Sequence, residues 1–419
     1  MKKRRKAYTY VLYILVLILL LGCSKMDKGN NSIEDGLPKT EDGQNKEDNK
    51  APIEKVDPIE EQIKEMSIEE KIGQMVTAGV EGYTLDENSI KLIEEHHVGG
   101  IIIFGKNVEN SNQLLSLIDS IKEVNSKNRI PLFISVDEEG GRVSRMPKEI
   151  KKLPTNRRIG QMNNKELSYK IGTILAEELN MFGFNMDFAP VLDINSNPKN
   201  PVIGDRAFGA ELEIVRDLGI ETMKGIQSGG IISVIKHFPG HGDTSVDSHI
   251  GLPTVEHDIE RLNSLELVPF RDAIKDGADT VMVAHILLSK IDPDYPSSLS
   301  KTVITGILRE KLGFKGVVIS DDMTMGAIVE NYEIGNAAIK AINAGSDIVL
   351  VAHGYDNSLA VINSIKEAVT NGIISEERLN ESVYRILSLK QKYNITDDIK
   401  DSIDIEGINN SIQEILAEF

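Results

Sequence analysis

The sequence predicts a (β/α)8 barrel, in which eight parallel strands close into a ring and each strand is followed by a helix. Three observations lead to this fold class. Eight short runs of apolar, largely β-branched residues recur along the chain, and amphipathic segments lie between most of them. The part of the chain that carries them is about 340 residues long, which favours a barrel over most other single domains.

The predicted strands are continuous apolar runs, which is typical of a parallel sheet that is buried on both faces. They cover residues 74–80, 98–104, 131–136, 184–191, 231–235, 280–284, 316–320 and 347–351. Predicted helices between them cover residues 165–182, 212–227, 258–275, 301–311 and 334–344. Before the first strand, Ser67 and Glu70 have the spacing of a capping box. After the eighth strand, helices at 358–370 and 376–392 are expected to complete the outer ring.

The first residues have the organisation of an export signal. Basic residues 2–6 precede an apolar run from Tyr10 to Leu21, which is shorter than the roughly 20 residues of a membrane-spanning helix. Cys23, the only cysteine, follows this run, as in bacterial lipoprotein signals. We expect a signal peptide over residues 1–22, lipidation of Cys23, and a lipid-anchored position on the cell membrane that faces outside the cytoplasm. The alternative is an uncleaved membrane anchor with an incidental cysteine.

The rest of the chain divides into three segments. Residues 23–58 are polar and poor in apolar side chains, so we expect a disordered linker. Residues 59–395 carry the barrel pattern, and residues 396–419 are expected to be a tail without regular structure. A net charge of −18 argues against nucleic acid as a partner, and we expect a monomer.

Polar residues stand at the carboxyl ends of six consecutive predicted strands, starting with the third. They are Asp137, Asp187, Lys236, His237, His285, Asp321, Asp322 and His353. In a barrel these strand ends meet at one face, which is where active sites lie in this fold. The pattern therefore indicates an active site rather than a set of packing contacts.

Two parts of this set suggest a reaction. An apolar run leads to Asp321, which would present its carboxylate at the barrel mouth as a nucleophile, a metal ligand or a helix cap. Asp247 and His249 are two residues apart and can pair, and the carboxylate would favour the charged imidazolium. A carboxylate nucleophile that faces such an acid/base group matches the double displacement of retaining glycosidases, although the usual acid there is a second carboxylate.

Several motifs, in order along the chain, resemble glycoside hydrolase family 3. Residues 307–321 (ILREKLGFKGVVISD) resemble its active-site signature. Residues 236–249 (KHFPGHGDTSVDSH) are similar to a loop of the bacterial β-N-acetylglucosaminidases of this family, whose acid/base is an Asp–His dyad. Further matching segments lie at 135–145, 185–191, 204–209 and 282–285. The resemblance runs from about residue 60 to residue 390.

The resemblance implies a role for each matching residue. Asp321 would be the nucleophile, His249 the acid/base and Asp247 its partner. The N-acetylglucosamine would be held by charged side chains, which suit sugar hydroxyls: Asp137, Arg145, Arg206, Lys236 and His237. No cofactor is implied. We therefore expect a retaining exo-β-N-acetylglucosaminidase that hydrolyses terminal β-N-acetylglucosamine from cell-wall glycans, such as peptidoglycan or muropeptides. The aglycone, the tolerance for β-glucosides and the choice between water and phosphate as acceptor stay open.

Other interpretations of the same residues are open at this point. One is a metal-dependent barrel hydrolase with zinc or manganese ligands among His237, His241, Asp243, Asp247 and His249, although such enzymes usually draw ligands from several strand ends. Another is a lipoprotein that binds a solute without turnover, which would have two lobes of open sheet. We expect His241 to shape its loop through a backbone hydrogen bond, and Asp187 to be the buried partner of a pocket cation. His285 could line the pocket or lie in the core.

Overall fold

The structure, a computed structural model, describes residues 57–419. The expected signal peptide, the expected lipidation site Cys23 and nearly all of the expected linker lie outside the described residues. Within residues 57–419, no helix combines the length and the apolar character that crossing a membrane requires.

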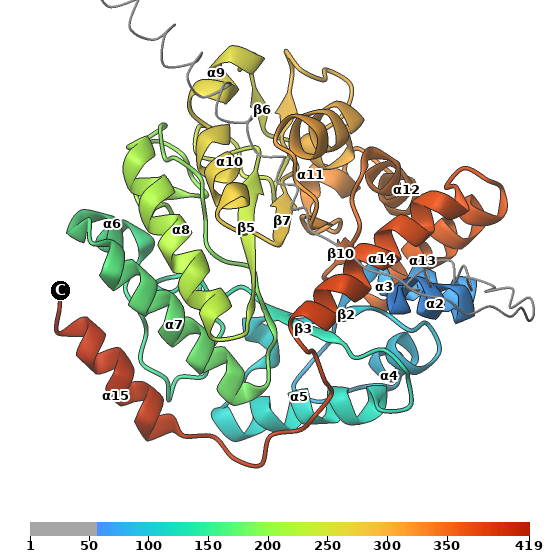
Figure 1. Ribbon diagram of the computed structural model, residues 1–419, viewed down its shortest axis with the longest axis horizontal. Helices are drawn as coiled ribbons and strands as arrows, with labels where there is room; N and C mark the ends of the chain where they lie inside the picture. The colour runs from blue at the N-terminus through green and yellow to red at the C-terminus, as the bar shows by residue number, and fades with distance from the viewer. Residues whose placement is uncertain (1–56) are drawn as a thin grey trace, which may run out of the picture. The chain divides into compact units, whose positions relative to one another are not determined.

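Eight parallel strands form the centre of the molecule (Figure 1). They are β1 (Val76–Gly79), β2 (Gly100–Ile103), β3 (Phe133–Val136), β4 (Met186–Asp187), β5 (Ile232–Phe238), β7 (Thr280–Val283), β9 (Val317–Ser320) and β10 (Val349–Val351). Their order in the sheet is β10-β1-β2-β3-β4-β5-β7-β9, and each neighbouring pair is parallel. A parallel bridge between Ile319 and Ile348 joins β9 to β10 and completes the ring. The predicted (β/α)8 barrel is confirmed.

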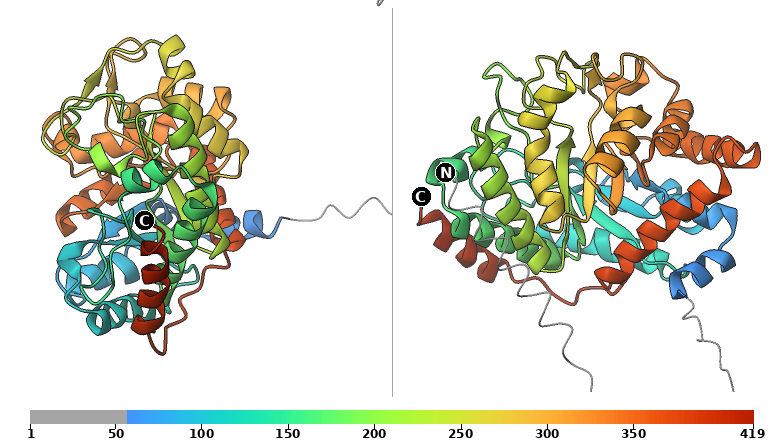
Figure 2. Two further views of the ribbon diagram at one scale, coloured as in Figure 1. Left: turned by 90° about the vertical axis from the view of Figure 1, so that its left-hand side faces the viewer. Right: turned by 45° about the horizontal axis from the view of Figure 1, so that its top comes forward.

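Helices surround the strands, as the two views of Figure 2 show. The main ones are α3 (Ile68–Gln74), α4 (Glu87–Glu94), α5 (Ser111–Asn125), α7 (Lys165–Phe182), α8 (Leu212–Ser228), α10 (Leu267–Lys275), η4 (Thr302–Lys311), α12 (Ile334–Ala344), α13 (Tyr355–Thr370) and α14 (Glu376–Lys392). The predicted capping box forms at the start of α3, because Ser67 and Glu70 each bond the backbone amide of the other. Shorter elements are α2 (Pro58–Glu65), α6 (Asn156–Met162), α9 (Ile259–Ser264), α11 (Gly326–Val329), β6 (Thr254–Val255), β8 (Leu287–Leu288), η1 (Gly105–Asn107), η2 (Gly204–Arg206) and η3 (Ser297–Leu299).

The buried apolar residues of the strands and of the surrounding helices form the core together. Every residue of β2, β3, β7 and β9 is buried. Both faces of each strand are covered, which explains why the strand sequences are largely apolar runs without alternation. Polar side chains are therefore displaced to the strand ends, and those at the carboxyl ends converge on one face.

Two predicted elements are shorter than expected, and each contains a proline. The helix predicted at 258–275 is divided into α9 and α10 at Leu265. A continuous helix would need an N–H at Pro269 to bond the Leu265 carbonyl, and proline has none. The strand predicted at 184–191 is reduced to β4, and the chain pairs with β5 again only at Val191, after Pro190.

The expectation of an unstructured tail at residues 396–419 is wrong. Residues Ile405–Leu416 form helix α15, which begins at the N-cap Asp404 and lies beside α7 (Figure 1). Its residues Ile408, Ile412 and Ile415 are buried. Their spacing places them on one face of a helix, so the apolar stripe explains why this segment folds onto the barrel.

Candidate active site

A cavity of about 390 Å3 opens at the carboxyl ends of the strands. All eight site residues predicted within the barrel line this cavity: Asp137, Arg145, Arg206, Lys236, His237, Asp247, His249 and Asp321. The structure therefore brings together residues that are up to 184 positions apart in the chain (137 to 321). It shows their placement, and their individual roles stay predictions.

Asp321 stands directly after β9, where the apolar strand ends. Its backbone amide donates to the Val283 carbonyl of the neighbouring strand β7 (2.9 Å), which fixes the backbone at this point. Burial opposes ionisation of the carboxyl group, but the nearby histidines His285 and His237 outweigh it and lower the pKa of Asp321. The carboxylate is thus ionised at neutral pH, as a nucleophile must be.

Asp247 and His249 form a pair on the loop that follows β5. Oδ1 of Asp247 accepts hydrogen bonds from the backbone amide and from Nδ1 of His249, both at 2.9 Å. Burial opposes ionisation of Asp247, but these two hydrogen bonds outweigh it and lower its pKa. The imidazole of His249 is 67% exposed. With Nδ1 bound to the carboxylate, Nε2 is the ring nitrogen left to exchange a proton with a ligand in the cavity.

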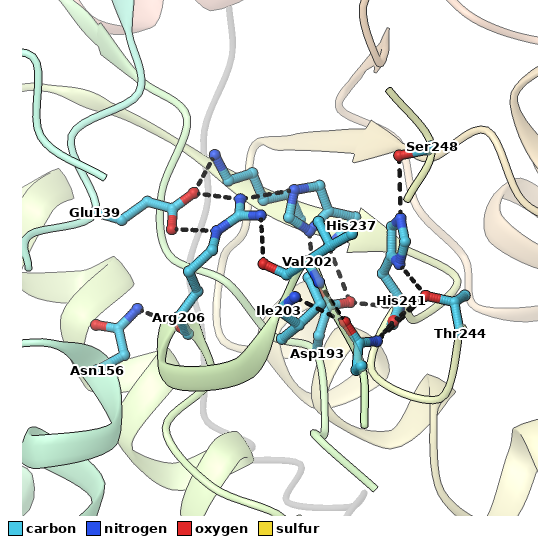
Figure 3. Close-up of polar contacts among 12 residues, drawn as sticks. Glu139, Asn156, Asp193, Val202, Ile203, Arg206, His237, His241, Thr244 and Ser248 are labelled. Carbon is cyan, nitrogen blue, oxygen red and sulfur yellow. Dashed lines mark hydrogen bonds and ion pairs between the residues drawn. The ribbon is translucent and has the colours of Figure 1, made fainter. Parts of the chain in front are cut away.

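Three predicted sugar-binding residues belong to one buried ion network. Lys236 Nζ lies 2.6 Å from Asp137 and 2.7 Å from Glu139. Arg206 binds the same Glu139 through two nitrogens, at 2.7 and 2.9 Å (Figure 3). Burial opposes ionisation of Glu139, but the two cations outweigh it and hold its pKa far below the usual range. Glu139 thus compensates two buried cations and holds them at the edge of the cavity.

Glu139 and Asp193 hold predicted site residues in place, and neither has a role in the sequence-based predictions. Asp193 is fully buried, and its Oδ2 lies 2.7 Å from Nδ1 of His237. Nε2 of His237 lies 3.3 Å from Nη2 of Arg206, so Asp193 orients a residue of the predicted sugar-binding set (Figure 3). Glu139 lies within the motif at 135–145 and could have been found there, whereas Asp193 lies outside every motif. Its pairing with a residue 44 positions away is visible only in the fold.

The surroundings of Asp187 and His285 can be compared with the predictions made for them. The prediction that Asp187 pairs with a pocket cation is wrong. Its Oδ1 accepts from the backbone amide of Glu138 (3.0 Å), and it forms no ion pair with any described residue. His285 lies in the core rather than the pocket wall, with Nδ1 2.6 Å from the Ser298 hydroxyl and Nε2 2.9 Å from the Asp322 carbonyl.

Two further histidines line the cavity. The ring nitrogens of His241 lie near two hydroxyls, Thr244 Oγ1 (2.7 Å) and Ser248 Oγ (3.3 Å), rather than near a backbone group. The imidazole of His353 packs against the ring of Phe104, with 5.1 Å between centroids. Neither ring belongs to the network around Glu139.

The geometry does not support the two alternatives. The side chains proposed as metal ligands are divided among separate pairs, since Asp243 binds His257 (2.8 Å) and Asp247 binds His249. Among the residues described, no three His, Cys, Asp or Glu side chains are grouped as metal ligands. The solute-binding alternative requires two lobes of open sheet, and the structure has a single ring of strands.

A buried carboxylate and a carboxylate–imidazole pair at the mouth of such a barrel fit the class of the glycoside hydrolases. Comparison with known proteins agrees. Residues 67–389 match the family described as glycosyl hydrolase family 3 N terminal domain. The chain belongs to glycoside hydrolase family 3.

Curated relatives in this family are named β-hexosaminidases. β-Hexosaminidase A of Pseudoalteromonas piscicida is 35% identical over 333 residues, which is 74% of this chain and 56% of the relative, so the chain spans little more than half of that protein. The β-hexosaminidase of Methylobacillus flagellatus is 36% identical over 68% of this chain and 82% of its own length.

Solved structures of family 3 enzymes are also similar to this chain. A family 3 β-N-acetylglucosaminidase from Paenibacillus sp. FPU-7 has a TM-score of 0.79 and is 42% identical, over 84% of this chain and 68% of that one. Zinc-bound CbsA from Thermotoga neapolitana has a TM-score of 0.72 and is 30% identical, over 78% of this chain and 69% of that one.

Proposed function

We propose that the protein is a retaining β-N-acetylhexosaminidase that removes terminal β-linked N-acetylglucosamine. One observation carries this proposal: the ionised carboxylate of Asp321 and the Asp247–His249 pair line the same cavity. The choice of sugar is supported by the relatives, which are named β-hexosaminidases and β-N-acetylglucosaminidase.

The proposed reaction has two steps. First, a carboxylate oxygen of Asp321 attacks the anomeric carbon while Nε2–H of His249 protonates the glycosidic oxygen, so the alcohol leaves and a glycosyl ester remains. Second, Nε2 of His249 accepts a proton from water as the water oxygen attacks the anomeric carbon, and Asp321 leaves as a carboxylate. Two inversions at one carbon give net retention. Asp247 accepts the Nδ1–H bond and stabilises the imidazolium.

The ion network would bind the sugar in the orientation that this attack needs. Asp137 and Lys236 are positioned as a hydrogen-bond acceptor and donor at the cavity edge, 2.6 Å apart. Arg206 and His237 are fixed by Glu139 and Asp193. The backbone amide of Arg145 donates to Glu138 (2.7 Å), and its side chain lines the cavity. Charged groups held in place before the sugar arrives cost little to reorganise during the reaction.

A chromogenic β-N-acetylglucosaminide and the soluble form lacking residues 1–50 test this proposal. We expect release of the chromophore that EDTA does not reduce, and a loss of about 10⁴-fold or more in Asp321→Asn. Asp276→Asn is the control, since Asp276 pairs with Lys224 at the surface (2.7 Å) and does not line the cavity, and it should leave the activity unchanged. Activity that EDTA abolishes, or that survives in Asp321→Asn, would contradict the proposal.

We also propose that the natural substrate is peptidoglycan or a muropeptide, and that the enzyme is anchored outside the cytoplasm through a lipid on Cys23. The support is the order of basic, apolar and cysteine residues at the start of the chain, because peptidoglycan is the N-acetylglucosamine polymer at that location. The full chain and Cys23→Ser should differ in their membrane fraction in a bacterial host. Equal partitioning would exclude the anchor, and failure to release N-acetylglucosamine from purified muropeptides would exclude the substrate.

A further inference from the structure

We propose that His241 is a positioning residue: through the hydroxyl of Ser248 it holds the loop that carries Asp247 and His249 over the cavity. The inference rests on the proposed function, in which His249 is the acid/base. It concerns how a residue on an exposed loop keeps a defined position relative to a sugar bound in the barrel.

Ser248 is the anchor point of the loop. It is 2% exposed, although it stands in a stretch where Val246 is 42% and Ile250 is 72% exposed. Its carbonyl oxygen accepts a hydrogen bond from the backbone amide of Ala327 (3.1 Å), at helix α11. Its hydroxyl lies 3.3 Å from Nε2 of His241. Because Asp247 and His249 are its immediate neighbours, the two bonds at Ser248 determine where the pair stands.

The bonds of Thr244 favour one of the two neutral tautomers of His241. The single proton of the Thr244 hydroxyl is donated to the His241 carbonyl (3.0 Å), and Asn200 Nδ2 donates to the same hydroxyl oxygen (3.2 Å). With the Thr244 proton on the carbonyl, the hydroxyl oxygen accepts from Nδ1 of His241, 2.7 Å away, so these contacts favour the tautomer protonated at Nδ1. Burial and the neighbouring His237 lower the pKa of His241 to about 4, so the ring is neutral. A neutral ring protonated at Nδ1 accepts at Nε2, which is where the Ser248 hydroxyl donates.

The same arrangement connects the loop to the sugar-binding set. Oδ1 of Asp193 accepts from the backbone amide of His241 (2.6 Å), while Oδ2 of Asp193 binds the ring of His237 (2.7 Å). Figure 3 shows the sequence of contacts from Ser248 through His241 and Asp193 to His237. The buried carboxylate of Asp193 thus positions both His237, which is predicted to bind the sugar, and His241, whose ring anchors the loop of the acid/base pair. Breaking the link at Ser248 should displace His249 without disturbing His237.

The test compares kcat/KM for two aryl β-N-acetylglucosaminides, because kcat/KM reports the step in which the leaving group departs. A phenyl glycoside needs protonation of its leaving oxygen, whereas a 2,4-dinitrophenyl glycoside does not. We expect Ser248→Ala to lose roughly 3- to 10-fold on the phenyl substrate, as for one hydrogen bond, and under 2-fold on the dinitrophenyl substrate. Ser245→Ala, an exposed serine of the same loop, is the matched control and should change neither.

Two further variants keep the outcomes distinct. Thr244→Val removes the acceptor that sets the tautomer of His241 and should show the same selective loss as Ser248→Ala. His249→Ala reports on the proposed function itself and should lose about 10²- to 10⁴-fold, again mainly on the phenyl substrate. If His249→Ala is selective but Ser248→Ala and Thr244→Val lose equally on both substrates, or not at all, the positioning role is overturned. If His249→Ala loses equally on both substrates, the assignment of His249 as the acid/base is contradicted, and the proposal for His241 loses its basis.

Discussion

Single buried carboxyl groups near the predicted sugar-binding residues show that burial in the barrel opposes ionisation. Glu138, Glu178 and Asp187 are buried, and burial raises the pKa of each. A neighbouring carboxylate adds to the rise in each case: Glu139 beside Glu138, and Glu138 beside Glu178 and Asp187. The pKa of Glu138 rises to about 7. Oδ2 of Asp187 has no hydrogen-bond partner among the described residues. Burial and like-charge neighbours thus oppose ionisation of these groups, whereas neighbouring histidines favour the ionised form of Asp321 and two cations favour that of Glu139.

This contrast predicts a pH-dependent gain in stability for Glu178→Gln. A carboxyl group with a raised pKa keeps its proton in the folded state while the unfolded chain loses it above about pH 4.5. The group therefore lowers the free energy of unfolding as pH rises above about 4.5 towards the folded pKa, and a neutral isostere removes that effect. We expect the variant to gain stability relative to the parent between pH 5 and pH 7.5, on the order of 1–3 kcal/mol. Urea unfolding at both pH values measures it, with the adjacent exposed Glu177→Gln as control. An equal difference at both pH values would contradict the prediction.

The residues that could be predicted from the sequence are those at the ends of apolar strands. The position of Asp321 follows from the register of β9, and the order of strands then brings it to the same mouth as Asp137 and Lys236. Glu139 and Asp193 could not be assigned in this way. Their roles come from pairing with Arg206 and His237, which are distant in the chain, and a single sequence does not show which buried groups meet.

At the scale of elements, helix α15 lies outside the repeated strand–helix pattern of the barrel. Ile408, Ile412 and Ile415 form a helical stripe after an N-cap aspartate, so both signals of a helix were present in the sequence. The prediction of an unstructured tail gives these signals too little weight. The opposite holds at 258–275, where the apolar pattern continues past Leu265 although Pro269 interrupts the helix there.

The position of α15 predicts that it contributes to stability and not to catalysis. Ile412 is fully buried in the contact with the barrel, and none of the cavity-lining residues belongs to this helix. Ile412→Ala should destabilise the docked helix by about 2–5 kcal/mol, which hydrogen exchange of the α15 amides would measure. We expect kcat/KM to stay unchanged. Ile399→Ala, at a 59% exposed position, should alter neither quantity. A loss of activity in Ile412→Ala at full folding would show that α15 communicates with the site.

For the whole molecule, the closed barrel was predictable because it repeats one pattern, but the contacts that join β9 to β10 were not. The strands β9 and β10 share a single bridge, whereas the other neighbouring strands form longer ladders. Asp347 strengthens this seam at the amino end of β10. Its Oδ2 accepts from the Val318 amide (3.0 Å), and its own amide donates to the Val318 carbonyl (2.8 Å). Nothing in the sequence distinguishes this aspartate from an ordinary strand-start residue.

The charge of Asp347 also holds the outer helices, so its removal should weaken the molecule as a whole. The buried carboxylate binds three arginines, Arg309 from η4 (2.5 Å) and Arg385 and Arg378 from α14 (3.1 and 3.3 Å). Burial opposes its ionisation, but the three cations outweigh it and lower the pKa of Asp347. Asp347→Asn keeps the shape and leaves the cations uncompensated, which should cost about 3–5 kcal/mol at pH 7 in urea unfolding. Because a carboxylate with a lowered pKa contributes stability that is lost on acidification, the difference from the parent should shrink as pH falls through the folded pKa.

Asp276→Asn, which breaks a surface pair with Lys224 (2.7 Å), is the control and should lower the free energy of unfolding by under about 1 kcal/mol. A cost for Asp347→Asn no larger than that of the surface pair would mean that β9 and β10 stay joined without this charge.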